Sequence, residues 1–177
     1  MTLVPNIIWL MALGTVALDI ALVVKIVALL HHPSRVRIQK GGDKYGLLVI
    51  FMLSTLALVG TLWLQYGAGL APCVFCWYQR IFMYPIPLLS LVAMMKGKTL
   101  SDVSDYILAL SFFGFAFALY QHLLQVLPSG ALIPCDAAND CAVRSVFEFG
   151  FVTLPWMAVT MFTAIFIIAL VARKKFS

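Results

Sequence analysis

Residues 151–172, FVTLPWMAVTMFTAIFIIALVA, form an apolar stretch without a single charged side chain. A helix needs about 20 mostly apolar residues to cross the hydrocarbon core of a bilayer. The stretch from Phe151 to Ala172 therefore predicts a transmembrane helix. Similar apolar stretches precede it at Asn6 to Leu30, Tyr45 to Tyr66, Phe75 to Met95 and Asp105 to Leu127. The sequence thus predicts an all-α membrane protein whose chain crosses the bilayer at each of these stretches.

The composition agrees with a membrane protein. Of 177 residues, 63% are hydrophobic and 11% are charged, values far from those of a soluble domain. The net charge of +5 comes from short basic clusters between the apolar stretches, not from one polar face, which argues against nucleic acid as a partner. The first stretch has no basic residues before it, so we expect a retained helix instead of a cleaved signal peptide.

The positions of the basic residues predict the orientation of the chain. They fall in a predicted loop after the first stretch, in a second loop after the third stretch, and at the C-terminus: Arg35, Arg37, Lys40 and Lys44; Lys96 and Lys98; Arg173, Lys174 and Lys175. Loops rich in Lys and Arg stay in the cytoplasm. We therefore expect the N-terminus outside, together with the loops at residues 67–76 and 128–150.

Cys73 and Cys76 form a C-x-x-C motif where the first outer loop enters a helix. Two thiols at this spacing can close a small ring, and the N-terminus of a helix favours a thiolate. The motif alone is also compatible with a static disulfide or with half of a metal site. A thiolate metal site is disfavoured on the oxidising side of a membrane.

The second outer loop carries another pair, Cys135 and Cys141. All four cysteines are then expected to face an oxidising compartment, where disulfides persist. Either pair could be a purely structural bridge. Two pairs on two loops of the same face could instead exchange disulfides, because a thiolate can attack a neighbouring disulfide sulfur.

Polar residues lie inside the predicted helices next to the C-x-x-C motif. Arg80 lies one helical turn beyond Cys76, and His122 lies at a similar depth in the fourth stretch. With Gln79 they could bind a quinone carbonyl near the outer interface, since polar groups inside a bilayer usually mark function. The alternatives are that Arg80 extends to the lipid headgroups and that His122 only makes hydrogen bonds within the bundle. Asp19, another intramembrane charge, has no evident partner.

The segment Pro72 to Arg80, PCVFCWYQR, resembles the C-x-x-C-x-Y-x-R signature of the DsbB family, particularly its short BdbC-like members. The similarity extends to Tyr120-Gln121-His122, to the pair Cys135 and Cys141, and to Phe149-Gly150-Phe151 with Pro155. It implies a four-helix transmembrane bundle of DsbB type over residues 45–172. Residues 1–44 would add a transmembrane helix and a basic cytoplasmic loop, and residues 173–177 a basic tail.

The resemblance also implies an activity. Members of this family are quinone-linked disulfide bond formation proteins of the bacterial cytoplasmic (inner) membrane. Cys135, with Cys141 as its partner in the loop, would accept attack from a reduced extracytoplasmic thioredoxin-fold protein like DsbA. Cys73 would link that pair to Cys76, which would face ubiquinone or menaquinone. The resemblance also implies that Arg80 and His122 belong to the quinone site, and Gln79 is expected there from its position beside Arg80.

Three other classes fit part of this pattern. In vitamin K epoxide reductase homologues the loop cysteines precede the C-x-x-C motif, whereas here they follow it. A non-enzymatic scaffold would use both pairs as structural disulfides. A metal carrier would need a path of intramembrane metal ligands that the sequence lacks, and we expect no metal site. The pair Cys135 and Cys141 is also closely spaced for this family, which leaves the order of exchange between the loops open.

Overall fold

The computed structural model describes residues 3–30, 32–127 and 144–173. These residues form the helices α1 (Leu3–Leu30), α2 (His32–Tyr66), α3 (Val74–Met83), α4 (Pro85–Met95), α5 (Leu100–Val126) and α6 (Leu154–Ala172). Four of them, α1, α2, α5 and α6, are long and apolar enough to cross a membrane. The prediction of an all-α membrane protein is therefore confirmed.

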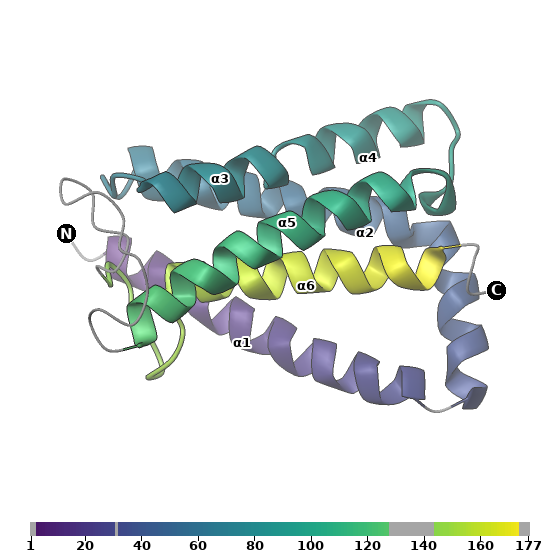
Figure 1. The fold of residues 1–177 in the computed structure, drawn as a ribbon, viewed down its shortest axis with the longest axis horizontal. Helices are drawn as coiled ribbons and strands as arrows, with labels where there is room; N and C mark the ends of the chain where they lie inside the picture. Colours follow the sequence, from purple (N-terminus) through teal and green to yellow (C-terminus); the bar gives the residue numbers. More distant parts are fainter. Residues whose placement is uncertain (1–2, 31, 128–143, 174–177) are drawn as a thin grey trace.

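The third predicted span is divided into two helices. Pro85 is the first residue of α4 and has no N–H group to continue the hydrogen bonds of α3, whereas the N–H of Tyr84 still bonds to the carbonyl of Arg80 over 2.9 Å. The break is small because Tyr84 keeps helical backbone angles, and Figure 1 shows α3 and α4 running on in nearly the same direction. Together they cover residues 74–95, about 33 Å at 1.5 Å per residue, enough to cross.

Two other boundaries differ from the sequence expectation. The basic segment with Arg35 and Lys40 was expected to be a loop, but it is the start of α2, which is helical from His32 onward. That expectation was wrong because Arg, Lys and Gln are good helix formers and can extend a helix beyond its apolar part. Helix α5 begins at Leu100, before the expected start at Asp105, because Asp102 accepts the backbone N–H of Thr99 over 2.9 Å and caps the helix.

Several helix ends lie together at one end of the bundle (Figure 1). The end of α2 and the start of α3 lie at the same end as the end of α5, the start of α6 and the start of α1 (Figure 1). The most extensive helix pair is α5 with α6. The two helices approach each other closely at Gly114 of α5, where an added Cβ would lie 2.2 Å from the ring of Phe162 of α6, which is fully buried. Small residues at such crossings allow helices to approach in membranes.

Candidate redox site

Cys73 and Cys76 lie at the start of α3. The chain leaves α2 after Tyr66 and turns through Gly69, whose φ of 69° favours glycine, before it reaches Cys73 at the N-cap of α3. The backbone N–H of Cys76 points to Cys73 Sγ at 3.4 Å, and the two Sγ atoms are 3.0 Å apart. A disulfide bond would measure about 2.05 Å, so both thiols are free, at a distance that a small rotation can close.

Gln121 of α5 holds this pair from the opposite side. Its Nε2 atom lies 3.1 Å from Cys73 Sγ and 3.7 Å from Cys76 Sγ. Its Oε1 atom accepts a hydrogen bond of 2.6 Å from Gln79 Nε2. Gln121 is 3% exposed, and its Oε1 atom also lies 4.0 Å from Cys76 Sγ. The two thiols thus have a hydrogen-bond donor that can stabilise charge on sulfur.

The two thiols are not equivalent. The hydrogen bond to the Cys76 sulfur and, after it, burial raise the pKa of the Cys73 thiol above its ordinary value. Cys73 therefore keeps its proton at neutral pH in the reduced pair.

Arg80 is fixed against α2. Its guanidinium donates hydrogen bonds to Gln65 Oε1 and, over 3.1 Å, to the carbonyl of Thr61. Its Cζ atom lies 5.1 Å from the centre of the Trp77 ring, a distance at which a cation and an aromatic ring attract. Arg80 is only 7% exposed, which argues against a side chain that extends to the headgroups.

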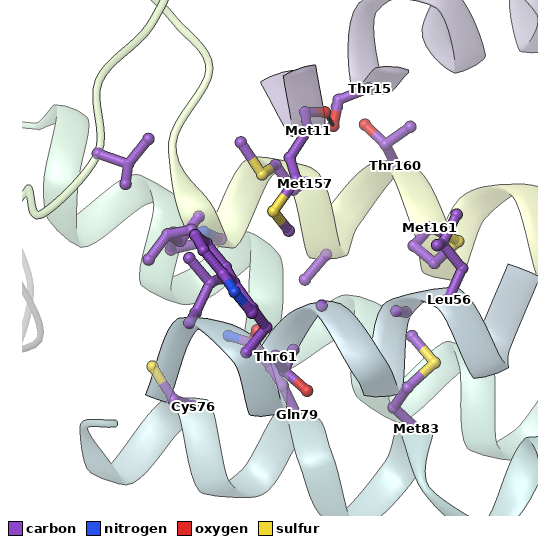
Figure 2. A pocket seen from close by; sticks show the side chains of 18 of the residues that line it. Met11, Thr15, Leu56, Thr61, Cys76, Gln79, Met83, Met157, Thr160 and Met161 are labelled. Atoms are coloured by element: carbon purple, nitrogen blue, oxygen red, sulfur yellow. Dashed lines mark hydrogen bonds between the residues drawn. The ribbon is translucent and has the colours of Figure 1, made fainter. Parts of the chain in front are cut away.

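A cavity of about 1140 Å³ opens beside these residues (Figure 2). One end is polar and is formed by Cys73, Cys76, Gln79 and Arg80, and most of the remaining lining is apolar. Tyr84 also lines the cavity, and its buried hydroxyl has no hydrogen-bond partner among the described residues. A polar end and a long apolar remainder fit a molecule with a carbonyl-bearing ring and a hydrocarbon tail.

The structure does not bring His122 to this cavity. The Nδ1 atom of His122 makes a hydrogen bond of 2.9 Å with Thr153 Oγ1, and the imidazole lies 4.9 Å from the Trp156 ring. Thr153 is also the N-cap of α6, where its hydroxyl accepts the N–H of Trp156 over 3.2 Å. His122 therefore joins α5 to the start of α6, and its assignment to the quinone site stays a prediction.

Cys135 and Cys141, the predicted loop pair, lie outside the described residues. Within residues 3–30, 32–127 and 144–173, no three His, Cys, Asp or Glu side chains are placed to hold a metal ion.

Sequence reasoning missed three residues of the site. Gln65 could have been found as an amide inside an apolar span, a position that is rare without a function. The carbonyl of Thr61 leaves no signal in a sequence, because every residue has one. Tyr84 lies in the middle of the third predicted span, and only the packing around it shows that its buried hydroxyl has no hydrogen-bond partner among the described residues.

Comparisons with known proteins agree with this geometry. The family model "Disulfide bond formation protein DsbB" matches residues 43–172. The SPbeta prophage-derived disulfide bond formation protein B of Bacillus subtilis (strain 168) is 37% identical over 123 residues, which are 70% of this chain and 82% of that protein. Disulfide bond formation protein C of the same organism is 31% identical, with 66% and 84% covered. The probable disulfide formation protein C of Halalkalibacterium halodurans is 36% identical, with 67% and 87% covered. No solved structure matches the chain. With four helices that can cross a membrane and a free cysteine pair at the start of α3, the chain belongs to the DsbB family of membrane disulfide bond formation proteins.

Proposed function

We propose that this protein reoxidises an extracytoplasmic thioredoxin-fold dithiol protein and passes the electrons to a quinone in the bacterial cytoplasmic membrane. The observation that carries the proposal is the position of the Cys73 and Cys76 thiols, 3.0 Å apart, on the wall of a largely apolar cavity. A structural disulfide would not need a cavity of this size next to it. A thiol pair that delivers electrons to a lipid-soluble acceptor does.

The first half of the proposed reaction is disulfide exchange. A thiolate of the reduced partner attacks Cys135 of the Cys135–Cys141 disulfide, and Cys141 leaves as a thiolate. The second partner thiol then resolves the mixed disulfide and frees Cys135. The partner gains one disulfide and the loop pair becomes a dithiol, so two electrons and two protons have moved.

The second half transfers these electrons to the membrane pair. A loop thiolate attacks the Cys73–Cys76 disulfide at Cys73, Cys76 leaves, and the loop disulfide forms again. Cys76 then carries the electrons at the edge of the cavity. The hydrogen bonds from Gln121 Nε2 keep both sulfur atoms in place during these exchanges.

Two residues at the polar end would hold the acceptor. Arg80, already positioned by Gln65, can donate to a quinone carbonyl, and Gln79 provides a further polar group on the same lining. A bound quinone would supply a two-electron, two-proton acceptor. The burial of Arg80 matters here, because water that reached the pair would compete for the same hydrogen bonds.

The proposed topology has the N-terminus outside and the C-terminus in the cytoplasm. It is supported by the basic residues Lys96 and Lys98 between α4 and α5 and by Arg173 after α6. An impermeant thiol reagent should label Cys135 in reduced spheroplasts without permeabilisation of the membrane. Labelling only after permeabilisation would indicate the opposite orientation.

The enzymatic proposal is tested by anaerobic mixing of the purified, lipid-reconstituted protein with a reduced thioredoxin-fold dithiol protein and a quinone. We expect quinone absorbance to fall only when all three components are present. A non-enzymatic scaffold would leave the absorbance unchanged. In a separate reaction with the partner in its oxidised form, the Cys135 thiolate of Cys141→Ser should attack the partner disulfide and stay in a mixed disulfide, because Cys141 is absent and cannot resolve it, whereas Cys135→Ser should form none. Equal trapping by both variants would contradict the assigned roles.

A further inference from the structure

Helix α1 lies outside the range matched by the family model, which begins at residue 43. Two hydrogen bonds nevertheless join it to α6. Asp19 Oδ2 accepts the indole N–H of Trp156 over 3.1 Å, and Asp19 Oδ1 accepts the Thr160 hydroxyl over 2.7 Å. A carboxylate inside a membrane helix is costly and seldom present without a role. Asp19 therefore fixes one face of α1 against α6.

That face of α1 forms one side of the cavity beside the redox pair. Met11, Gly14, Thr15 and Leu18 belong to its lining, and we call these four residues the α1 wall. In Figure 2, Met11 and Thr15 lie on one side of the cavity and Cys76 on the other. The polar end at Arg80 and the α1 wall are thus two parts of one continuous space.

The space is too large for a ring alone. Pockets of roughly 300–1,000 Å³ hold drug-sized ligands, and this cavity measures about 1140 Å³. Gly14 leaves part of it open, since a Cβ added there would meet no atom within 4 Å. A long apolar ligand with a polar head at Arg80 would extend toward Gly14.

We propose that the α1 wall binds the isoprenoid tail of the quinone and that Asp19 is the positioning residue that holds this wall in place. The inference depends on the proposed function, because it assigns the tail of the same acceptor. It gives this chain a determinant of acceptor affinity that lies outside the region shared with the family model.

The test compares a quinone that has a tail with its bare ring. The probes are a short-chain menaquinone and menadione, each titrated at a known mole fraction in lipid. The protein is used with its disulfides closed, so that no thiol reacts with the ring. The readout is quenching of tryptophan fluorescence, because Trp63 lines the cavity. Quenching reports binding and does not require turnover.

The main variant is Gly14→Phe, which fills the open part of the α1 wall. Its control is Leu13→Phe, which adds the same ring at a neighbouring position that is 44% exposed and outside the cavity lining. We expect Gly14→Phe to weaken binding of the tailed quinone about tenfold, or about 1.4 kcal/mol. The same variant should change the affinity for menadione less than about twofold. Leu13→Phe should bind both probes like the wild type.

Asp19→Leu removes both hydrogen-bond acceptors and should reproduce the selective loss for the tailed quinone. Asp19→Asn keeps one acceptor oxygen, so its affinity for the tailed quinone should fall between those of Asp19→Leu and the wild type. If Asp19 had a merely structural role, Asp19→Leu would weaken binding of both probes equally, and this result would overturn the inference. Unchanged binding of the tailed quinone to Gly14→Phe would also overturn it. If the wild type binds neither probe, the proposed function itself fails.

Discussion

Gln121 Nε2 lies 3.1 Å from Cys73 Sγ, and so a residue near the end of α5 contacts the cysteine that begins α3. The same amide reaches Cys76 Sγ at 3.7 Å. One side chain therefore touches both sulfur atoms of the redox pair, and it also accepts a hydrogen bond from Gln79. This contact ties the chemistry of the pair to the packing of α5 on α3.

Replacing Gln121 with Leu should slow quinone-linked turnover without loss of the protein. The variant removes the donor to both sulfur atoms, and a hydrogen bond to a charged group contributes about 1.5–3 kcal/mol, so we expect a loss of at least about tenfold in rate. Leu123→Ala, at an exposed position of α5, is the control. Steady-state rates in proteoliposomes of fixed quinone content measure the effect, and a wild-type rate in Gln121→Leu would contradict the role of the amide.

Replacing Cys76 with Ala should make Cys73 more reactive at neutral pH. The hydrogen bond to Cys76 is the main cause of the raised pKa of Cys73, so its removal lowers that pKa and increases the thiolate fraction. Site-resolved mass spectrometry of iodoacetamide labelling against pH, with both loop cysteines replaced by Ser, gives the midpoint for Cys73. The midpoint should move to lower pH in Cys76→Ala. The same midpoint with and without Cys76 would show that the two thiols are not coupled.

Arg80 should determine quinone affinity more than thiol exchange. Lys at this position keeps the charge but loses the planar fork that reaches both Gln65 and the Thr61 carbonyl. We expect Arg80→Lys to need about tenfold more quinone for the same rate, which corresponds to a loss of about 1.4 kcal/mol in quinone binding. Arg80→Met should need more quinone still. Single-turnover exchange with the partner should stay near normal. The measurement is the turnover rate as a function of the mole fraction of quinone in lipid. If both variants depend on quinone as the wild type does, Arg80 does not belong to the quinone site.

Gly114→Ala should destabilise the bundle. The new Cβ would lie 2.2 Å from the ring of Phe162, which is fully buried and cannot move freely. Overpacking of this kind costs about 1–3 kcal/mol. Gly14→Ala is the matched control, because its Cβ meets no atom within 4 Å. Thermal unfolding in detergent should show a lower midpoint for Gly114→Ala alone, partly recovered by Phe162→Leu in the same chain. Equal midpoints for the two glycine variants would contradict the close packing.

The sequence allowed the spans to be predicted because apolar length follows directly from bilayer thickness. It did not show which way each helix faces. The rise along the helix predicted His122 at the depth of Arg80, but one residue changes the direction of a side chain by about 100°. Gln121 consequently faces the cysteines, whereas His122 faces Thr153.

Long-range partners were equally beyond prediction. The hydrogen-bond partners of Asp19, Trp156 and Thr160, are on the last helix of the chain. Gln65 could be recognised as unusual in an apolar span, but its contact with Arg80 depends on how α2 packs on α3. Periodicity and composition describe single helices, and these contacts are made between helices.

The most direct test of the central claim counts partner thiols lost and quinol formed in one anaerobic reaction. The reduced thioredoxin-fold partner, the reconstituted protein and a quinone are mixed, and both products are followed to completion. The account predicts about two thiols lost for each quinol, as two-electron disulfide formation requires, and no reaction with Cys73→Ser or Cys76→Ser. Quinol formation that continues in either cysteine variant, or partner oxidation without quinol, would contradict it.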